Sequence, residues 1–250
     1  MEYIIVCPLV FLAGFIDAIA GGGGLISLPA YLIAGLPPHA AIGTNKFSSC
    51  CGTAVSTWHY ARCGFIKWPD VLPAVIMALI GSALGARLAL LVDADVFKVV
   101  MLIVIPLTAC YVLRPRSLDG NRTPYSKVKT ASIIALLALV VGAYDGFYGP
   151  GTGTFLMILL TALAHVGLNQ AAGTTKAINL STNVAALVVF LWHGVVWIPL
   201  ALVAAIFGIA GNYIGARYFT RKESRIARTV IILVLTIFFV KLLLEQFKLI

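Results

Sequence analysis

The sequence predicts an all-α integral membrane protein of about eight transmembrane segments, arranged as two repeats of inverted topology. Three observations indicate this fold class. Of the 250 residues, 61% are hydrophobic and only 11% are charged, whereas a soluble domain carries roughly 25% charged residues. The second half of the chain repeats motifs of the first half. Basic residues gather in a few short loops between apolar runs, which is the pattern that orients helices in a membrane.

The internal repeat consists of three pairs of matching blocks that occur in the same order in both halves. The partners lie 128 residues apart in the first pair and 130 residues apart in the other two, so one small insertion separates the copies. This predicts a tandem duplication, with a first membrane repeat over 1–113, a basic linker over 114–130 and a second membrane repeat over 131–250. The pairs are 14–23 (GFIDAIAGGG) with 142–151 (GAYDGFYGPG), 43–46 (GTNK) with 173–176 (GTTK), and 81–87 (GSALGAR) with 211–217 (GNYIGAR).

Each half predicts the same succession of helices. An apolar helix runs into a glycine-rich break, and a short apolar segment and three long helices follow. We expect the first two segments to form a broken or re-entrant hairpin, because irregular backbone in a membrane needs protein or a water-filled cavity to satisfy its polar groups. The expected segments are about 3–20, 25–35, 40–60, 69–90 and 96–113 in the first half, and 131–148, 153–165, 170–192, 197–217 and 226–247 in the second.

The loop charges predict how the helices are oriented. Residues 114–130 and 217–228 are both rich in lysine and arginine, so the positive-inside rule places both loops in the cytoplasm. Each half consists of a hairpin, which returns to the side where it started, and three single crossings. The first half therefore ends on the opposite side from where it began, so we expect the second half to lie upside down relative to the first and both termini to lie outside. The loop at 61–68 then lies inside, and its counterpart around His193 lies outside. We therefore expect a multi-pass protein of the cytoplasmic (inner) membrane.

The two glycine-rich breaks predict a binding site. Inverted-repeat transporters bind solutes near the middle of the membrane, where broken helices meet. Each break precedes a short helix whose first N–H groups lack intrahelical partners, and such groups suit an anion. The alternative is that the glycines only permit close helix packing. The candidate residues at the breaks are Gly21, Gly22, Gly23, Gly24, Gly149, Gly151, Thr152 and Gly153.

Two lysines in the long helices that follow favour an anion. Lys46 and Lys176 each lie early in a helix with no other charge, where a charge costs roughly 2.5–3.5 kcal/mol to insert. Each begins a polar stripe spaced i, i+3 and i+7, so two polar faces are expected to point inward. The alternative is that the lysines snorkel to the membrane surface. The candidate residues here are Thr44, Asn45, Lys46 and Ser49 in the first half, where Thr53 completes the stripe, and Thr174, Thr175, Lys176, Asn179 and Asn183 in the second.

Asp17 and Asp145 are the only acidic residues in the predicted hairpin helices, and both lie immediately before the breaks. Three roles stay open for them: ion pairs with Lys46 and Lys176, acceptance of backbone N–H bonds at the break, or proton relay. Ion pairing is favoured, because an unpaired carboxylate in a membrane is costly.

No other motif predicts a cofactor, a metal or a soluble enzyme activity. The five cysteines and four histidines show no metal-ligand spacing, and P-loop, HExxH and GxSxG motifs are absent. The net charge of +9 comes mostly from the basic loops, which argues against nucleic-acid binding. Small-xxx-small patterns at Gly81 with Gly85 and at Gly211 with Gly215 predict close helix packing.

The same motifs resemble those of a known family. Residues 14–24 followed by 43–46 are similar to the signature of the sulfite exporter TauE/SafE family, and 144–151 (YDGFYGPG) is similar to its companion motif. The resemblance covers nearly the whole chain and implies a bacterial or archaeal inner-membrane permease of about eight spans. Relatives in this family are linked to export or uptake of sulfite, sulfoacetate and other organosulfur anions. Thr175 occupies the position that corresponds to Asn45 of the first half, so the two halves need not contribute equally to a binding site.

These features predict a secondary transporter, not an enzyme, that moves a small anion of the sulfite or organosulfonate class by alternating access between the two breaks. Coupling to H+ or Na+, or facilitated efflux, follows by elimination, because no ATP-binding motif is present. The expected partners are the anion and the lipid bilayer; no cofactor is expected, and the oligomeric state is open. The alternatives are an assembly factor or channel without saturable transport and, least favoured, an intramembrane enzyme with Asp17 and Asp145 as a carboxylate dyad.

Overall fold

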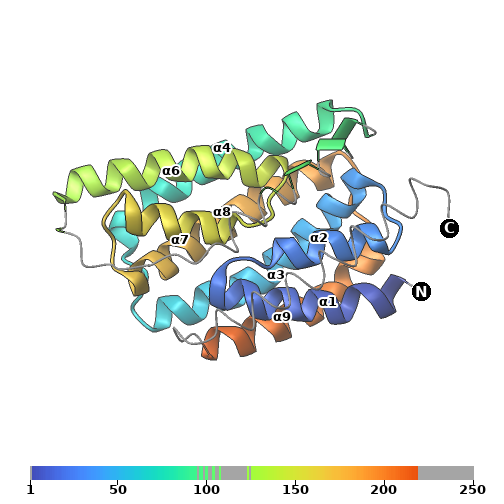
Figure 1. The fold of residues 1–250 in the computed structure, drawn as a ribbon, viewed down its shortest axis with the longest axis horizontal. Helices are drawn as coiled ribbons and strands as arrows, with labels where there is room; N and C mark the ends of the chain where they lie inside the picture. The colour runs from blue at the N-terminus through green and yellow to red at the C-terminus, as the bar shows by residue number, and fades with distance from the viewer. Residues whose placement is uncertain are drawn as a thin grey trace.

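The computed structural model describes residues 2–94, 96–97, 99–100, 103–104, 107, 123 and 125–218. Figure 1 shows an elongated helical bundle. Eight of the predicted helices are confirmed, with ends within about four residues of those expected; the predicted helix at 226–247, most of 96–113 and the loops at 114–122 and 219–228 lie outside the described residues. The helices are α1 (Glu2–Ala20), α2 (Gly24–Ile33), α3 (Pro38–Arg62), α4 (Trp68–Leu91), α6 (Lys127–Phe147), α7 (Thr152–Ala162), α8 (Leu168–Trp192) and α9 (Ile198–Arg217).

Proline and glycine define many of the helix ends. Helices α3, α4 and α9 each carry a proline at the first or second position, where the missing N–H has no intrahelical partner to lose. Gly35, Gly64 and Gly194 follow α2, α3 and α8 with φ values of 92°, 74° and 66°, the left-handed conformation that commonly ends a helix. The chain therefore turns sharply after these three helices.

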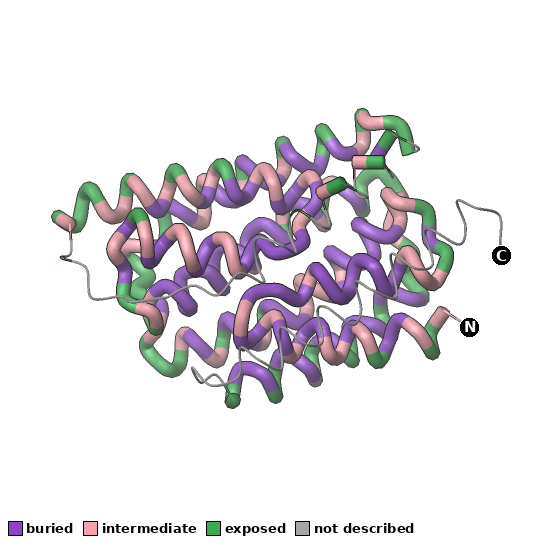
Figure 2. Tube along the Cα trace, viewed as in Figure 1, coloured by how far each residue is buried: buried purple, intermediate pink, exposed green. Residues whose placement is uncertain are grey.

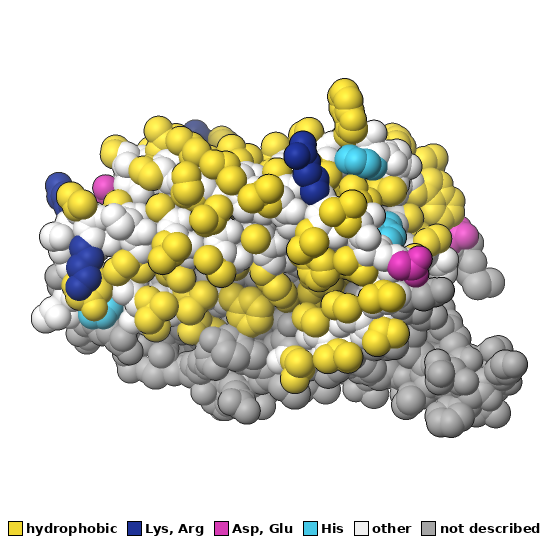
Figure 3. All heavy atoms as spheres, turned by 90° about the horizontal axis from the view of Figure 1, so that it is seen from above, with side chains coloured by type: hydrophobic (Ala, Val, Ile, Leu, Met, Phe, Trp, Pro, Cys, Tyr) yellow, Lys and Arg dark blue, Asp and Glu magenta, His cyan; other side chains and the backbone are white. Residues whose placement is uncertain are grey.

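The bundle is apolar on the outside and polar at its centre. Among the described residues, five helices (α1, α4, α6, α8 and α9) are long and apolar enough to cross a membrane. The outer face of α4 exposes an apolar residue at each turn, and Figure 3 shows apolar side chains over much of the visible surface. The inner faces of the helices are buried (Figure 2), and they carry the buried lysines, threonines and asparagines. The chain thus has the surface of a multi-pass membrane protein.

The hairpin of each half combines one long helix and one short helix. Helices α1 and α6 have 19 and 21 residues, whereas α2 and α7 have 10 and 11. At 1.5 Å per residue, the short helices reach about 15 Å, half of a hydrocarbon core of about 30 Å. The glycine-rich breaks between α1 and α2 and between α6 and α7 therefore lie inside the bundle. We expected this position for a broken hairpin, because protein must surround its irregular backbone.

The two halves pack into each other rather than side by side. Helix α1 packs along α9, and its repeat counterpart α6 packs along α4, the counterpart of α9. Helices α3 and α8 pack against each other at the centre, and also against α9 and α4 respectively. In Figure 1, α1 and α9 run toward the left of the view, while α6 and α4 run toward the right. The α1–α9 contact thus corresponds to the α6–α4 contact, and the helices of the second contact run in the opposite direction to those of the first.

Glycines bring the paired helices into backbone contact. A Cβ atom at Gly85 would collide with the carbonyl oxygen of Ala143 on α6, and one at Gly211 would collide with that of Phe11 on α1. The close packing predicted from the small-xxx-small patterns is therefore confirmed. It fixes each hairpin against a helix of the other half.

Candidate functional site

Two buried ion pairs join the halves next to the glycine breaks. Lys46 Nζ lies 2.6 Å from Asp145 Oδ2, and Lys176 Nζ lies 2.7 Å from Asp17 Oδ2. The pairing is crossed, because each lysine binds the aspartate of the other half. Both lysine side chains are only 3% exposed, so the snorkelling alternative is wrong and the predicted ion pairing is confirmed.

The two ion pairs have different surroundings. Lys46 also donates a hydrogen bond to Asn183 Oδ1 at 3.1 Å, and Asn183 donates to Thr53 Oγ1 at 3.4 Å. Lys176 instead donates to both the carboxylate and the main-chain carbonyl of Asp17. The carboxylates are held by separate lysines, which is not the arrangement of a carboxylate dyad sharing a proton.

The two glycine breaks contact each other directly. The chain leaves α1 through Gly21, whose φ is 73° and whose carbonyl accepts the N–H of Thr154 at 3.2 Å. Thr154 Oγ1 donates to the carbonyl of Ala20 at 2.7 Å. A Cβ atom at Gly153 would lie 2.6 Å from Gly21 Cα. The breaks therefore leave no room for a solute between Gly21 and Gly153, and the cavity lies beside this contact rather than between the breaks.

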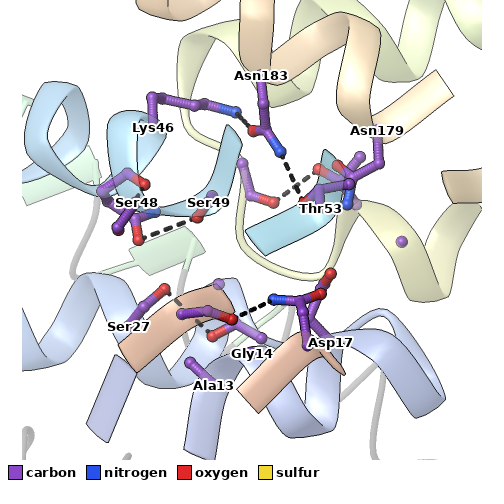
Figure 4. A pocket seen from close by; sticks show the side chains of 18 of the residues that line it. Ala13, Gly14, Asp17, Ser27, Lys46, Ser48, Ser49, Thr53, Asn179 and Asn183 are labelled. Atoms are coloured by element: carbon purple, nitrogen blue, oxygen red, sulfur yellow. Dashed lines mark hydrogen bonds between the residues drawn. The ribbon is translucent and has the colours of Figure 1, made fainter. Parts of the chain in front are cut away.

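A polar cavity opens beside the contact between the breaks. Its free space holds roughly three water molecules. Figure 4 shows side chains from α1, α2, α3 and α8 around it, with Lys46 and Asn183 facing Asp17 and Ser27 across the space. The cavity thus lies where the hairpin of the first half meets the central helices α3 and α8.

Most of the predicted site residues line this cavity. The amide and hydroxyl groups of the two polar stripes supply donors on one side, and the glycine breaks supply exposed backbone on the other. The predicted residues that line the cavity are Asp17, Gly21, Gly23, Gly24, Asn45, Lys46, Ser49, Thr53, Asp145, Gly149, Thr152, Gly153, Asn179 and Asn183.

Six predicted residues do not line the cavity and have other surroundings. Thr44 accepts the N–H of Trp197 at 3.0 Å and so ties α3 to the start of α9. Gly151 has a φ of 83° and forms the turn before α7. The six residues are Gly22, Thr44, Gly151, Thr174, Thr175 and Lys176.

Sequence reasoning missed several residues of the cavity. Among these, Asn212 on α9 donates to the carbonyl of Gly208 at 3.0 Å, and its buried Oδ1 has no partner among the described residues. A signal was present, since Asn212 is a polar residue in an apolar helix, inside the repeat block that aligns it with Ser82. The missed residues are Val10, Ala13, Gly14, Ser27, Ser48, Gly208 and Asn212.

The cavity breaks the symmetry of the repeat. Its outer wall comes from α1, α2 and α9, whereas α4 contributes no lining residue. At the repeat position of Ser27 the second half has Phe155, and at that of Asn212 it has Ser82, which donates to the carbonyl of Thr182 at 2.6 Å. The two halves therefore contribute unequally to the cavity.

Helix N-termini contribute less to the cavity than the glycine pattern predicts. The N–H of Thr152 is bonded to the carbonyl of Gly149, and that of Thr154 to the carbonyl of Gly21. These two N–H groups at the start of α7 therefore already have backbone partners. In the described part of the chain no three His, Cys, Asp or Glu side chains gather as a metal site.

Long apolar helices around a small, buried, polar cavity define a polytopic membrane protein of the transporter class. The chain belongs to the family described as "Sulfite exporter TauE/SafE", whose profile matches residues 6–242. The family resemblance of the sequence motifs is thus confirmed.

The most similar relatives share this class. A probable membrane transporter protein, ORF9, of Sinorhizobium sp. is 38% identical over 225 residues, which cover 90% of this chain and 85% of that protein. The probable membrane transporter protein YfcA of Escherichia coli K12 is 32% identical over 236 residues, covering 94% and 87%. A probable membrane transporter protein of Haemophilus influenzae is 31% identical over 237 residues, covering 94% and 92%. No solved structure matches the chain.

Proposed function

We propose that the protein is a secondary transporter that carries a small anion of the sulfite or organosulfonate class across the cytoplasmic membrane. The observation that carries the proposal is the ammonium group of Lys46, which is buried at the centre of the bundle and lines a cavity with amide and hydroxyl donors. Buried cations in a membrane commonly mark a substrate or ion pathway. The family's description as a sulfite exporter favours a sulfur oxyanion over other small anions.

The size of the cavity supports a small solute. Space for roughly three water molecules suits an ion of a few heavy atoms, such as sulfite or the head of a sulfonate. Beside Lys46, the neighbouring donors include the amides of Asn45 and Asn179 and the hydroxyl of Ser49. These neutral donors suit the oxygen atoms of an oxyanion.

The proposed mechanism is alternating access between two inverted repeats, over 1–113 and 131–250, with 114–130 as their linker. Three features support it: the reciprocal helix packing, the opposite directions of corresponding helices, and a polar cavity lined by Lys46 at the centre of the bundle. In this mechanism the cavity would open in turn to the two sides of the membrane and carry the solute past Lys46.

The proposed orientation places the α3–α4 turn, the start of α6 and the end of α9 in the cytoplasm. These three segments lie at one end of the bundle, the left end in Figure 1, and the start of α1 and the α8–α9 turn lie at the other. The basic residues Arg62, Lys67, Lys127 and Lys129 belong to the proposed cytoplasmic end, in accord with the positive-inside rule.

Sulfite flux into proteoliposomes tests the proposal. Removing one member of a buried ion pair costs roughly 3–5 kcal/mol, so both members are replaced together, as Lys46→Gln with Asp145→Asn. We expect saturable sulfite uptake in the wild type and at least about a tenfold loss in this variant, because the cavity loses its ammonium group.

The corresponding change at the other ion pair, Lys176→Gln with Asp17→Asn, is the matched control. Asp17 lines the cavity, but Lys176 does not, so this variant keeps the Lys46 ammonium group there. We therefore expect a smaller loss of flux than in the Lys46 variant. Wild-type flux in the Lys46 variant, at equal insertion and thermal stability, would show that the site assignment is wrong. Flux that never saturates would favour a channel.

A further inference from the structure

The two ion pairs beside the cavity carry no net charge. Lys46 is neutralised by Asp145, and Lys176 is neutralised by Asp17. An anion that enters this buried space brings a net negative charge, and an uncompensated charge away from water is strongly unfavourable. The cavity is therefore polar but not cationic, and a second, positive species has to accompany the anion.

We infer that the anion binds together with one proton, and that the proton is taken up by the carboxylate of Asp145. In this step a proton from water adds to Asp145 Oδ2, and the anion takes the place of the carboxylate as the partner of Lys46 Nζ. Lys46 stays an ammonium group throughout, and the net charge of the site remains zero. The inference rests on the proposed function and names the coupling ion at the same site.

The surroundings of the two ion pairs assign the proton to Asp145 rather than to Asp17. Lys46 and Asp145 both line the cavity, and the bond to Asn183 keeps the Lys46 ammonium beside it when the carboxylate is neutral. Lys176 does not line the cavity, and it also binds the main-chain carbonyl of Asp17. That neutral carbonyl remains an acceptor for Lys176 whatever the protonation state of the carboxylate, and Lys176 does not face the cavity from which an anion would bind.

The backbone beside the Lys46–Asp145 pair leaves little space for other groups. A Cβ atom at Gly149 would lie 3.1 Å from Asp145 Oδ1 and 3.3 Å from Lys46 Nζ. The glycine thus lets the chain pass directly against the ion pair. Lys46 and Asp145 can therefore move apart only on the side that faces the cavity, where the anion enters.

Few other charged groups face Asp145 from the elements around α6. The only charged residue of α8 is Lys176, which is held by Asp17 of α1, and α7 has no titratable side chain. Helix α4 carries Asp70 in its first turn and the exposed Arg87, and Tyr144 of α6 donates to the carbonyl of Pro150. Within the described residues, Lys46 is the charged group that contacts Asp145.

Binding of methanesulfonate to the purified protein tests the inference, because this probe stays a monoanion throughout the range used. If one proton enters with each anion, the affinity falls about tenfold per pH unit from about pH 6 to about pH 8. Calorimetry in two buffers of different ionisation enthalpy then reports uptake of one proton per anion. Asp145→Asn should abolish both effects, whereas Asp70→Asn, which changes a carboxylate that does not line the cavity, should retain the pH slope.

The outcomes separate this inference from the proposed function. Binding that is independent of pH, with no proton uptake by the wild type, overturns the inference and leaves anion transport standing. Affinity that depends on Na+ concentration instead of pH also overturns it and assigns coupling to sodium. If neither sulfite nor methanesulfonate binds the wild type, both the proposed function and the inference fail. The proton count of the wild type decides even if Asp145→Asn is unstable.

Discussion

Single residues decide which of the two similar halves carries the cavity. Lys46 and Lys176 occupy the same repeat position, and both are buried in ion pairs with an aspartate. Of the two lysines, only Lys46 lines the cavity, together with Ser27 and Asn212, whose counterparts Phe155 and Ser82 do not. The sequence could not show which lysine lines the cavity, because the two halves differ at residues that lie outside the repeated motifs or that are not shared within them.

The glycine beside the Lys46–Asp145 pair gives a prediction at this scale. In Gly149→Ala, the φ of 99° costs about 1–3 kcal/mol, and the new Cβ also presses on the ion pair. We expect a lower melting temperature and a clear loss of sulfite flux. Thermal unfolding in detergent and proteoliposome uptake measure the two effects.

Gly35→Ala provides the control for backbone strain. Gly35 has a similar φ of 92°, but a Cβ atom there would meet nothing within 4 Å. This variant should lose stability from the strained φ alone and keep its flux. Equal flux in both variants would contradict the claim that Gly149 positions the ion pair.

At the scale of elements, the helix boundaries and the hairpins could be read from the sequence. Glycine and proline positions placed the helix ends, and apolar run lengths separated the long helices from α2 and α7. The contact between the two breaks could not be read, because it joins residues more than a hundred positions apart. For that reason, the expected position of the solute between the breaks differs from the observed cavity beside them.

The contact between the breaks predicts the effect of a single added methyl group. In Gly153→Ala, the Cβ atom would lie 2.6 Å from Gly21 Cα and 2.7 Å from its carbonyl oxygen. The backbone at Gly21 and Gly153 cannot move apart without shifting the helices that it connects. We therefore expect the free energy of unfolding to fall by at least about 2 kcal/mol. The measurement is the melting temperature of the purified protein.

Gly167→Ala is the matched variant for this test. Gly167 also lies at the start of a helix, with a φ of −62°, and a Cβ atom there has nothing within 4 Å. It should change stability by less than about 1 kcal/mol. Similar melting temperatures for the two variants would show that the breaks separate more easily than the structure indicates.

At the scale of the whole molecule, the reciprocal packing gives the inverted-repeat proposal a testable consequence. The α3–α4 turn and the α8–α9 turn correspond in the repeat, yet they lie at opposite ends of the bundle. Cys63 lies exposed in the first turn, and His193 lies exposed at the start of the second. The two positions therefore report on opposite membrane faces.

Labelling of intact cells with a membrane-impermeant maleimide checks this orientation. In a background without other cysteines, His193→Cys should be labelled from outside, whereas Cys63 should react only after the membrane is permeabilised. Labelling of both positions from the same side would contradict the inverted arrangement. Labelling of both in permeabilised cells shows that each thiol is accessible.

The sequence by itself determined the membrane class, the duplication, the helix order and the residue types at the centre, because hydrophobic run lengths and repeated motifs are local properties of the chain. It also identified the family, since the motifs around Asp17, Lys46 and Asp145 are short and contiguous. Only the tertiary structure decided that each lysine pairs with the aspartate of the other half, that the glycine breaks touch, and that only Lys46 of the two lysines lines the cavity. These features depend on contacts between segments that lie far apart in the sequence, and local patterns of the chain do not specify such contacts.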